Sequence, residues 1–153
     1  MVPDMDFMSG YNYPVISFVK DLKQGLWDLE KGQMVILPKF EVAEIVGNTI
    51  LAGDFGRFGI FDKSGATILP MEFESIDIHD NVYVVKKNGL YGLYSLQGKE
   101  IAPLTFDQIK VYDNNIKCYS PKGITLMKLA ANGSIKGEKT YENYVSISIE
   151  KER

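Results

Sequence analysis

The sequence predicts an all-β protein made of four tandem copies of a four-stranded β-meander, each of about 33 residues. The first reason is a fixed internal period, because the rings Phe40, Phe73 and Phe106 lie 33 residues apart and each is followed by an acid. The second reason is the alternation of apolar side chains within each copy, the pattern of a strand with one buried face. A fourth copy ends in Tyr141-Glu142, 35 residues after Phe106.

The first strand of each copy shows this alternation most clearly. It is predicted at Val15–Lys20, and its equivalents are residues 49–54, 82–87 and 115–120. Cys118 occupies the position of Ala52 and Val85, so we expect a small core residue rather than a reactive thiol. The alternate apolar residues are Ile16, Phe18, Ile50, Ala52, Tyr83, Val85, Ile116 and Cys118.

The second strand carries an aromatic–glycine signature, as in Phe58-Gly59-Ile60-Phe61. Both faces of this strand are apolar, so both must be covered if large rings are not to lie in water. The small glycine predicts that an aromatic ring packs on bare backbone of the neighbouring strand. The equivalent segments are Gln24-Gly25-Leu26-Trp27 and Tyr91-Gly92-Leu93-Tyr94.

Turns and prolines separate the remaining strands. A glycine at residues 32, 65, 98 and 133 favours hairpin turns that require positive φ. The third strand then reaches Pro38, Pro70 or Pro103, which cannot donate to a ladder and so should mark a strand end or a crossing to a new layer. The fourth strand opens with the aromatic–acid pair, whose acid we expect to accept backbone hydrogen bonds. These pairs are Phe40-Glu41, Phe73-Glu74, Phe106-Asp107 and Tyr141-Glu142.

Two segments, residues 22–31 and 124–131, contain good helix formers. The repeat alignment predicts strands there instead. We expect one domain over residues 15–150, with copies at 15–46, 47–79, 80–112 and 113–150, followed by a tail at 151–153. Residues 1–14 are predicted to form a loosely held N-terminal arm that could also cap an open edge.

These motifs resemble the bacterial WG-repeat family, whose units run aromatic–glycine, apolar, aromatic, glycine turn, aliphatic–proline and aromatic–acid. The resemblance covers roughly residues 15–150. The tryptophan–glycine pair itself does not occur: copy one has Gln24-Gly25, and copy four has neither glycine nor ring at Thr125-Leu126. The resemblance implies a tandem β array with no catalytic residues, used for binding or scaffolding.

For the overall architecture we expect a propeller-like closed ring. The C-terminal YVSISIE would then pair with VISFVK near the N-terminus. The alternative is an open curved array, with two edges that need protection.

Composition narrows the function classes. The 17 basic and 20 acidic residues give a formal charge of −3, so the sequence shows no footprint for nucleic acid. No segment approaches membrane-spanning length, a single cysteine excludes an internal disulfide framework, and no ligand spacing suggests a metal or another cofactor. The only histidine, His79, is interpreted as a turn residue. We expect a soluble, cytoplasmic protein if the chain is complete, and an exported form with a removed signal stays open.

The sequence therefore predicts a non-catalytic repeat module that binds another protein. The alternative is a carbohydrate or cell-envelope ligand module that uses aromatic rings of the second strands. An inter-repeat core role for these rings is the competing interpretation. The rings are Trp27, Phe58, Phe61, Tyr91 and Tyr94.

Overall fold

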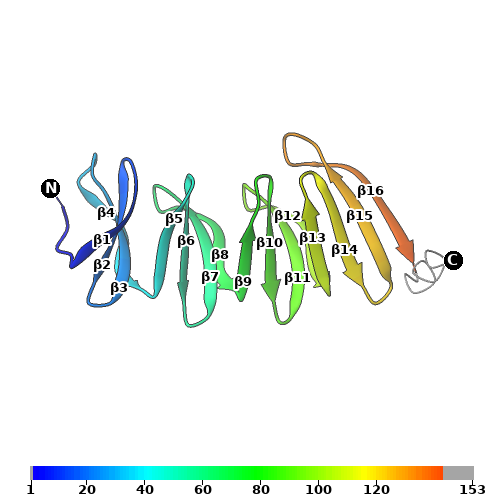
Figure 1. Cartoon of the computed structure of the whole chain (residues 1–153), viewed down its shortest axis with the longest axis horizontal. Coiled ribbons are helices and arrows are strands. Elements are labelled where there is room, and N and C mark those ends of the chain that lie inside the picture. Colours follow the sequence, from blue (N-terminus) through cyan, green and yellow to red (C-terminus); the bar gives the residue numbers. More distant parts are fainter. Residues whose placement is uncertain (1, 143–153) are drawn as a thin grey trace. The chain divides into compact units, whose positions relative to one another are not determined.

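The computed structural model describes residues 2–142 as 16 strands in four antiparallel four-stranded sheets (Figure 1). This confirms the predicted all-β fold with four repeats. The first sheet contains β1 (Phe7–Asn12), β2 (Val15–Lys20), β3 (Lys23–Asp28) and β4 (Gln33–Phe40). The second contains β5 (Val42–Val46), β6 (Thr49–Asp54), β7 (Arg57–Asp62) and β8 (Thr67–Phe73). The third contains β9 (Ser75–Ile78), β10 (Val82–Lys87), β11 (Leu90–Ser95) and β12 (Glu100–Phe106). The fourth contains β13 (Gln108–Tyr112), β14 (Asn115–Ser120), β15 (Gly123–Leu129) and β16 (Ile135–Glu142).

The strand predictions hold at the level of single elements. The first strand of each copy coincides with β2, β6, β10 and β14. The first helix-prone segment contains β3, and the second overlaps β15, so the repeat pattern overrides the local helix propensity. The turn glycines between the second and third strands, at residues 32, 65, 98 and 133, all have positive φ, as predicted.

The sheets do not coincide with the sequence copies. The last strand of each of the first three copies pairs with the first strand of the next copy, as β5 does with β6. The second, third and fourth sheets therefore each take their first strand from the preceding copy. A single residue then separates consecutive sheets, and it is the acid of the aromatic–acid pair: Glu41, Glu74 or Asp107. The repeated aromatic–acid motif therefore lies at the connection between consecutive sheets.

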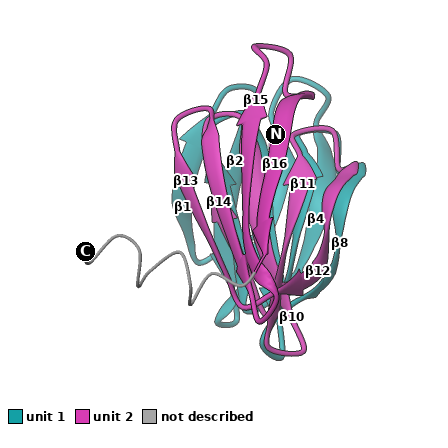
Figure 2. Ribbon diagram, turned by 90° about the vertical axis from the view of Figure 1, so that its right-hand side faces the viewer, with its two compact units in different colours: residues 1–73 teal, residues 74–153 magenta. Residues whose placement is uncertain are grey.

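Two compact units make up the chain, residues 1–73 and 74–153, coloured separately in Figure 2. In the first unit, Val15, Leu26 and Ile36 of the first sheet pack against Ala43, Ile50 and Ala52 of the second. In the second unit, Val82, Val84, Leu93 and Ala102 of the third sheet pack against Ile109, Ile116, Cys118, Met127 and Leu129 of the fourth. Equivalent repeat positions build both cores: the first and third sheets use the face of the second strand that carries Leu26 or Leu93, and the second and fourth sheets use the face that carries Phe61 or Met127.

The prolines of the third strands lie inside these strands, which corrects the sequence prediction. Pro38 lies within β4, which continues to Phe40, and Pro70 and Pro103 lie within β8 and β12 in the same way. These strands are the edge strands of their sheets, and each has an irregular register with its neighbour. Edge strands and bulges are the places where a missing N–H is tolerated.

The glycine of the signature faces the backbone of the bulged strand rather than an aromatic ring. A Cβ atom on Gly59 would lie 2.7 Å from the carbonyl oxygen of Leu69 and 2.8 Å from the amide nitrogen of Met71. Gly25 meets the backbone of Ile36 and Pro38 at similar distances. The aromatic–glycine and aliphatic–proline motifs are thus the two sides of one close backbone approach.

The second strand of the fourth copy, β15, aligns with the second strands of the other copies one residue away from the predicted alignment. Gly25, Gly59 and Gly92 pair with the fourth residue of the preceding strand, and Thr125 pairs with Cys118 at that position. The equivalents of the aromatic–glycine pair are therefore Ile124-Thr125, not Thr125-Leu126. A one-residue slip exchanges the two faces of a strand, so Leu126 faces away from the core and Met127 faces into it.

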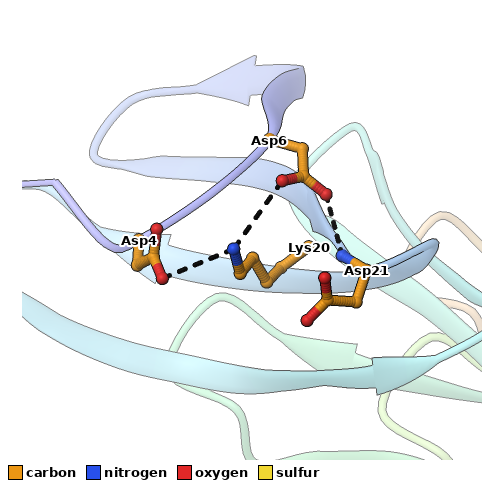
Figure 3. A network of polar contacts seen from close by, with 4 residues as sticks. All are labelled: Asp4, Asp6, Lys20 and Asp21. Atoms are coloured by element: carbon orange, nitrogen blue, oxygen red, sulfur yellow. Dashed lines mark hydrogen bonds and ion pairs between the residues drawn. The ribbon is translucent and has the colours of Figure 1, made fainter.

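The N-terminal arm is held by specific contacts, which corrects the prediction that it is loose. Residues 7–12 form β1 on the edge of β2, so the alternative prediction, a cap on an open edge, describes the structure. Asp6 accepts a hydrogen bond from the amide of Asp21 at 2.8 Å, and Asp4 and Asp6 both lie near the Lys20 ammonium (Figure 3). Met5 packs on the cluster of Ile16, Phe18 and Trp27.

The strand pairing predicted for a closed ring is not formed at β2. Both edges of β2 are occupied, one by β1 and the other by β3. The proposed partner, residues 144–150, lies outside the described residues. The choice between a closed ring and an open array stays a prediction.

Candidate interaction surface

The turns between the first and second strands of the copies differ in a way that the repeat does not require. In the first three copies both central residues have positive φ, as type I′ turns demand. These residues are Asp21-Leu22, Phe55-Gly56 and Asn88-Gly89. The third pair is the sequence that this turn favours most, since Asn and Gly tolerate positive φ.

Leu22 and Phe55 are unfavourable residues for these turns. Leu22 has φ of +66° and is 91% exposed, and Phe55 has φ of +51° and is 86% exposed. A bulky side chain with positive φ is strained, and an exposed one gains nothing from the core. Both turns lie at the same end of their sheets within the first unit, at the lower edge of Figure 1.

The aromatic rings of the second strands do not form one platform. Trp27 pairs with Ile16 and joins the cluster on the outer face of the first sheet. Phe61 packs on the core between the first and second sheets, and Phe58 points to the opposite face of β7 because neighbouring strand residues alternate. Tyr91 packs against the core of the second unit, and Tyr94 is half-buried.

The repeated aromatic–acid pairs lie across from the signature residues. Phe73 pairs with Phe58, Phe106 with Tyr91, Tyr141 with Ile124 and Phe40 with Gln24. Glu74 accepts a hydrogen bond from the Gly89 amide at 3.3 Å, at the turn between β10 and β11 rather than at the start of β9. Glu41, Asp107 and Glu142 are exposed.

Gln24 shows what replaces the aromatic residue in the first copy. Its side-chain oxygen accepts a hydrogen bond from the Ala43 amide at 2.8 Å. Ala43 belongs to the second sheet, so this departure from the repeat joins two sheets by a polar contact within the first unit.

His79 lies in the turn after β9, where its amide donates to the Val82 carbonyl at 3.0 Å. This agrees with the predicted turn position. A polar cleft of about 520 Å³ opens beside it, and the Asn81 side chain donates to the Asn114 oxygen there at 2.6 Å. Across residues 2–142 no group of three His, Cys, Asp or Glu side chains could hold a metal ion.

The Cys118 thiol is fully buried, in line with the predicted core role. Burial, with a smaller contribution from Glu138, raises the pKa of the thiol to about 12. A thiol with so high a pKa is a poor nucleophile at neutral pH. In the described part of the chain, no helix is long and apolar enough to cross a membrane.

A comparison with protein families supports the resemblance seen in the sequence. The family model "WG containing repeat" matches residues 58–91 and 91–116. Residues 58–116 are WG repeats. The matched WG repeats contain both Gly59 and Gly92 and both adjoining prolines, Pro70 and Pro103. Comparison with curated proteins gives no match.

Several solved structures show a weak likeness to this chain. Hsv2 of Kluyveromyces lactis is 17% identical with a TM-score of 0.45, over 90% of this chain and 53% of that one. The N-terminal domain of Nup159 is 10% identical with a TM-score of 0.44, over 94% and 46% of the two chains. A eukaryotic initiation factor is 8% identical with a TM-score of 0.47, over 91% and 45%. The chain thus spans about half the length of these structures, and at these scores the likeness supports no conclusion about function.

Sequence reasoning missed Leu22 and Phe55. The repeat alignment places them opposite Asn88-Gly89, and this substitution of turn residues by bulky ones was a detectable signal. It became informative only with the exposed fractions and the φ angles, which the sequence does not contain.

Proposed function

We propose that the chain is a non-catalytic interaction module that binds another protein through the turn tips at Leu22 and Phe55. The observation that carries this proposal is the combination of positive φ and nearly complete exposure at two equivalent turns. Neither residue serves the packing of the first unit, because both lie outside its cores. A protein partner would bury their side chains.

The energetic argument depends on the third copy. A residue other than glycine in the left-handed region costs about 1–2 kcal/mol. Asn88-Gly89 forms the equivalent turn with residues suited to positive φ, so the fold itself does not require a leucine or a phenylalanine. Large apolar residues at the centre of an interface commonly contribute most of its binding energy. A contact with a partner therefore accounts for both residues.

Site-specific photo-crosslinking in the source cells tests this proposal. A photoreactive phenylalanine analogue is placed at position 22 or 55, and at Lys31 or Lys63 as controls, and cross-linked proteins are identified by mass spectrometry. We expect one protein to be captured from positions 22 and 55 and not from the controls. Equal capture at all four positions, or none at positions 22 and 55, would contradict the proposal.

The carbohydrate or cell-envelope alternative has no specific observation in its favour. Trp27 is only 8% exposed, and Phe61 contacts a different cluster, so these two rings do not share a surface on which a sugar could stack. We therefore propose protein binding as the function and retain the core interpretation for these rings.

A further inference from the structure

The outer face of the fourth sheet has an unusual charge. Strand registers place Lys110 opposite Lys117 and Leu126 opposite Lys139, all on the side away from the core. Lys128 lies on the same face, opposite Asn115. The twelve positions of this face in β13–β16 contain four lysines and no acid.

Aromatic and aliphatic side chains lie between these lysines. Tyr112, Tyr119 and Tyr141 share the face, and Tyr112 is 56% exposed. Ile124 separates Tyr119 from Tyr141 across the strands, and Leu126 is 36% exposed. The face therefore mixes positive charge with apolar contact area.

The corresponding face of the third sheet is a core surface. Val82, Val84 and Leu93 occupy positions there that Asn115, Lys117 and Leu126 occupy in the fourth sheet. A sheet face that lies in water needs polar residues to stay soluble. Solubility explains polar residues, but it does not explain charges of a single sign.

The opposition of Lys110 and Lys117 is costly. Like charges directly across a β ladder destabilise it. The Lys110 ammonium lies 5.9 Å from the centroid of the Tyr119 ring, and the Lys139 ammonium lies 5.0 Å from that of Tyr141. The contact of Lys110 with the Tyr119 ring offsets a part of the repulsion between Lys110 and Lys117, and a bound anion would remove it.

We propose that this face binds an acidic polypeptide segment that also carries apolar side chains. Carboxylates of the segment pair with the lysines, and its apolar residues contact the tyrosines and aliphatic side chains of the face. This surface consists of residues other than the turn tips of the proposed function, and its test does not depend on them.

The charge of the remaining chain favours a short acidic segment over a nucleic acid. Without the four lysines, the chain contains 13 basic and 20 acidic residues, so the remainder is negatively charged. A polynucleotide extends its phosphates along its whole length and would meet this negative remainder. A short segment of a polypeptide meets the lysines alone.

Fluorescence anisotropy with the full chain tests the proposal. The probe is a synthetic peptide in which Glu and Asp alternate with Leu and Phe, and its control has Gln and Asn in place of the acids. A double variant, Lys110→Glu with Lys117→Glu, is compared with Lys31→Glu and Lys99→Glu, which change the charge equally at exposed turns. Thermal melts confirm that both variants remain folded.

We expect saturable, salt-sensitive binding of the acidic peptide that weakens by about tenfold or more in the Lys110–Lys117 variant and by less than about twofold in the control variant. Amide resonances of β13–β16 should shift on binding, and the variant Leu22→Gly with Phe55→Asn should bind the peptide normally. No binding, equal binding of the uncharged peptide, or equal losses in both lysine variants would overturn the proposal. Tighter binding of oligo-dT, or self-association abolished by the Lys110–Lys117 variant, would also overturn it in favour of a nucleic acid or a second copy.

Discussion

The second and the fourth sheets differ in how their last two strands pair, β7 with β8 and β15 with β16. In the second sheet, Gly59 lies against a bulge in β8 that contains Pro70. In the fourth sheet, Thr125 occupies the equivalent position, and β15 pairs with β16 in regular register from Gly123 to Lys128. The Thr125 and Thr140 hydroxyls lie 3.1 Å apart across this ladder.

This difference shows that the glycine and the proline-containing bulge depend on each other. Where the edge strand bulges toward its neighbour, the neighbour has to be glycine, because any Cβ would meet backbone atoms. Where the edge strand is straight, a β-branched residue fits and forms a cross-strand pair. The fourth copy lacks both the glycine and the proline, which agrees with this dependence.

The largest expected effect comes from Gly59→Thr, which puts the residue of the fourth sheet into the second. Its Cβ would lie 2.7 Å from Leu69 O, so the bulge must move. We expect a loss of about 3 kcal/mol in the free energy of unfolding, or failure to fold. Urea unfolding measures it, with Thr67→Ser, a change at an exposed β8 position, as control. A loss under about 1 kcal/mol would show that the backbone approach is not tight.

The reverse change, Thr125→Gly, should cost less. It removes the hydroxyl pair with Thr140 and adds backbone freedom to the unfolded chain. Together these effects amount to about 1–2 kcal/mol in urea unfolding. Thr125→Val keeps the shape and separates the hydrogen-bond part of the loss. If glycine at position 125 increased the stability, β16 would have to approach the backbone of β15 as closely as β8 approaches β7. That result would contradict the regular register of β15 and β16.

Cys118→Ala introduces the residue found at the equivalent position of the second sheet, Ala52. Because the pKa of the folded thiol is raised to about 12 while the unfolded thiol ionises near its ordinary value, the thiol's stabilising contribution is complete below the unfolded pKa. It is lost as pH rises toward the folded value. We expect wild-type stability to fall more between pH 9 and 12 than that of the alanine variant.

Chemical denaturation across this pH range measures the difference between the two proteins. Thiol alkylation gives a separate check, since the folded protein should react only through unfolding. Parallel pH curves for wild type and Cys118→Ala, or fast alkylation of the native protein, would contradict the buried position.

How much of this could be predicted from the sequence depends on the element. The strands at residues 15–20 and 82–87 were predictable because period-two alternation and the repeat agree there. The sheet boundaries were not, because a repeat starts at any point of its period and only pairing shows which strands share a sheet. The lysine face was hidden for the same reason: Lys110, Lys117 and Lys128 belong to three different strands, and only the strand register shows that they share one face.

The smallest expected effect concerns the turn after the second strand. Asp62 accepts hydrogen bonds from the Ser64 hydroxyl at 2.6 Å and from the Ala66 amide at 3.0 Å, whereas Asn132 fills a similar role in the fourth copy. The Ser64 hydroxyl and these amides lower the pKa of Asp62, so its contribution is present above the unfolded pKa and is lost as pH falls through the lower folded value. Asp62→Asn should change stability by less than about 0.5 kcal/mol at pH 7. Urea unfolding at pH 7 and at low pH checks both statements, and a larger loss in Asp62→Ala at low pH than at pH 7 would contradict them.

The central claim is that Leu22 and Phe55 serve a partner and not the fold, and one double variant tests it directly. Leu22→Gly with Phe55→Asn gives both turns residues that suit positive φ. We predict that the melting temperature rises by about 2–4 °C while the partner captured by cross-linking is lost in a pull-down from source cells. A lower melting temperature with unchanged capture would show that these residues stabilise the fold and would contradict the account.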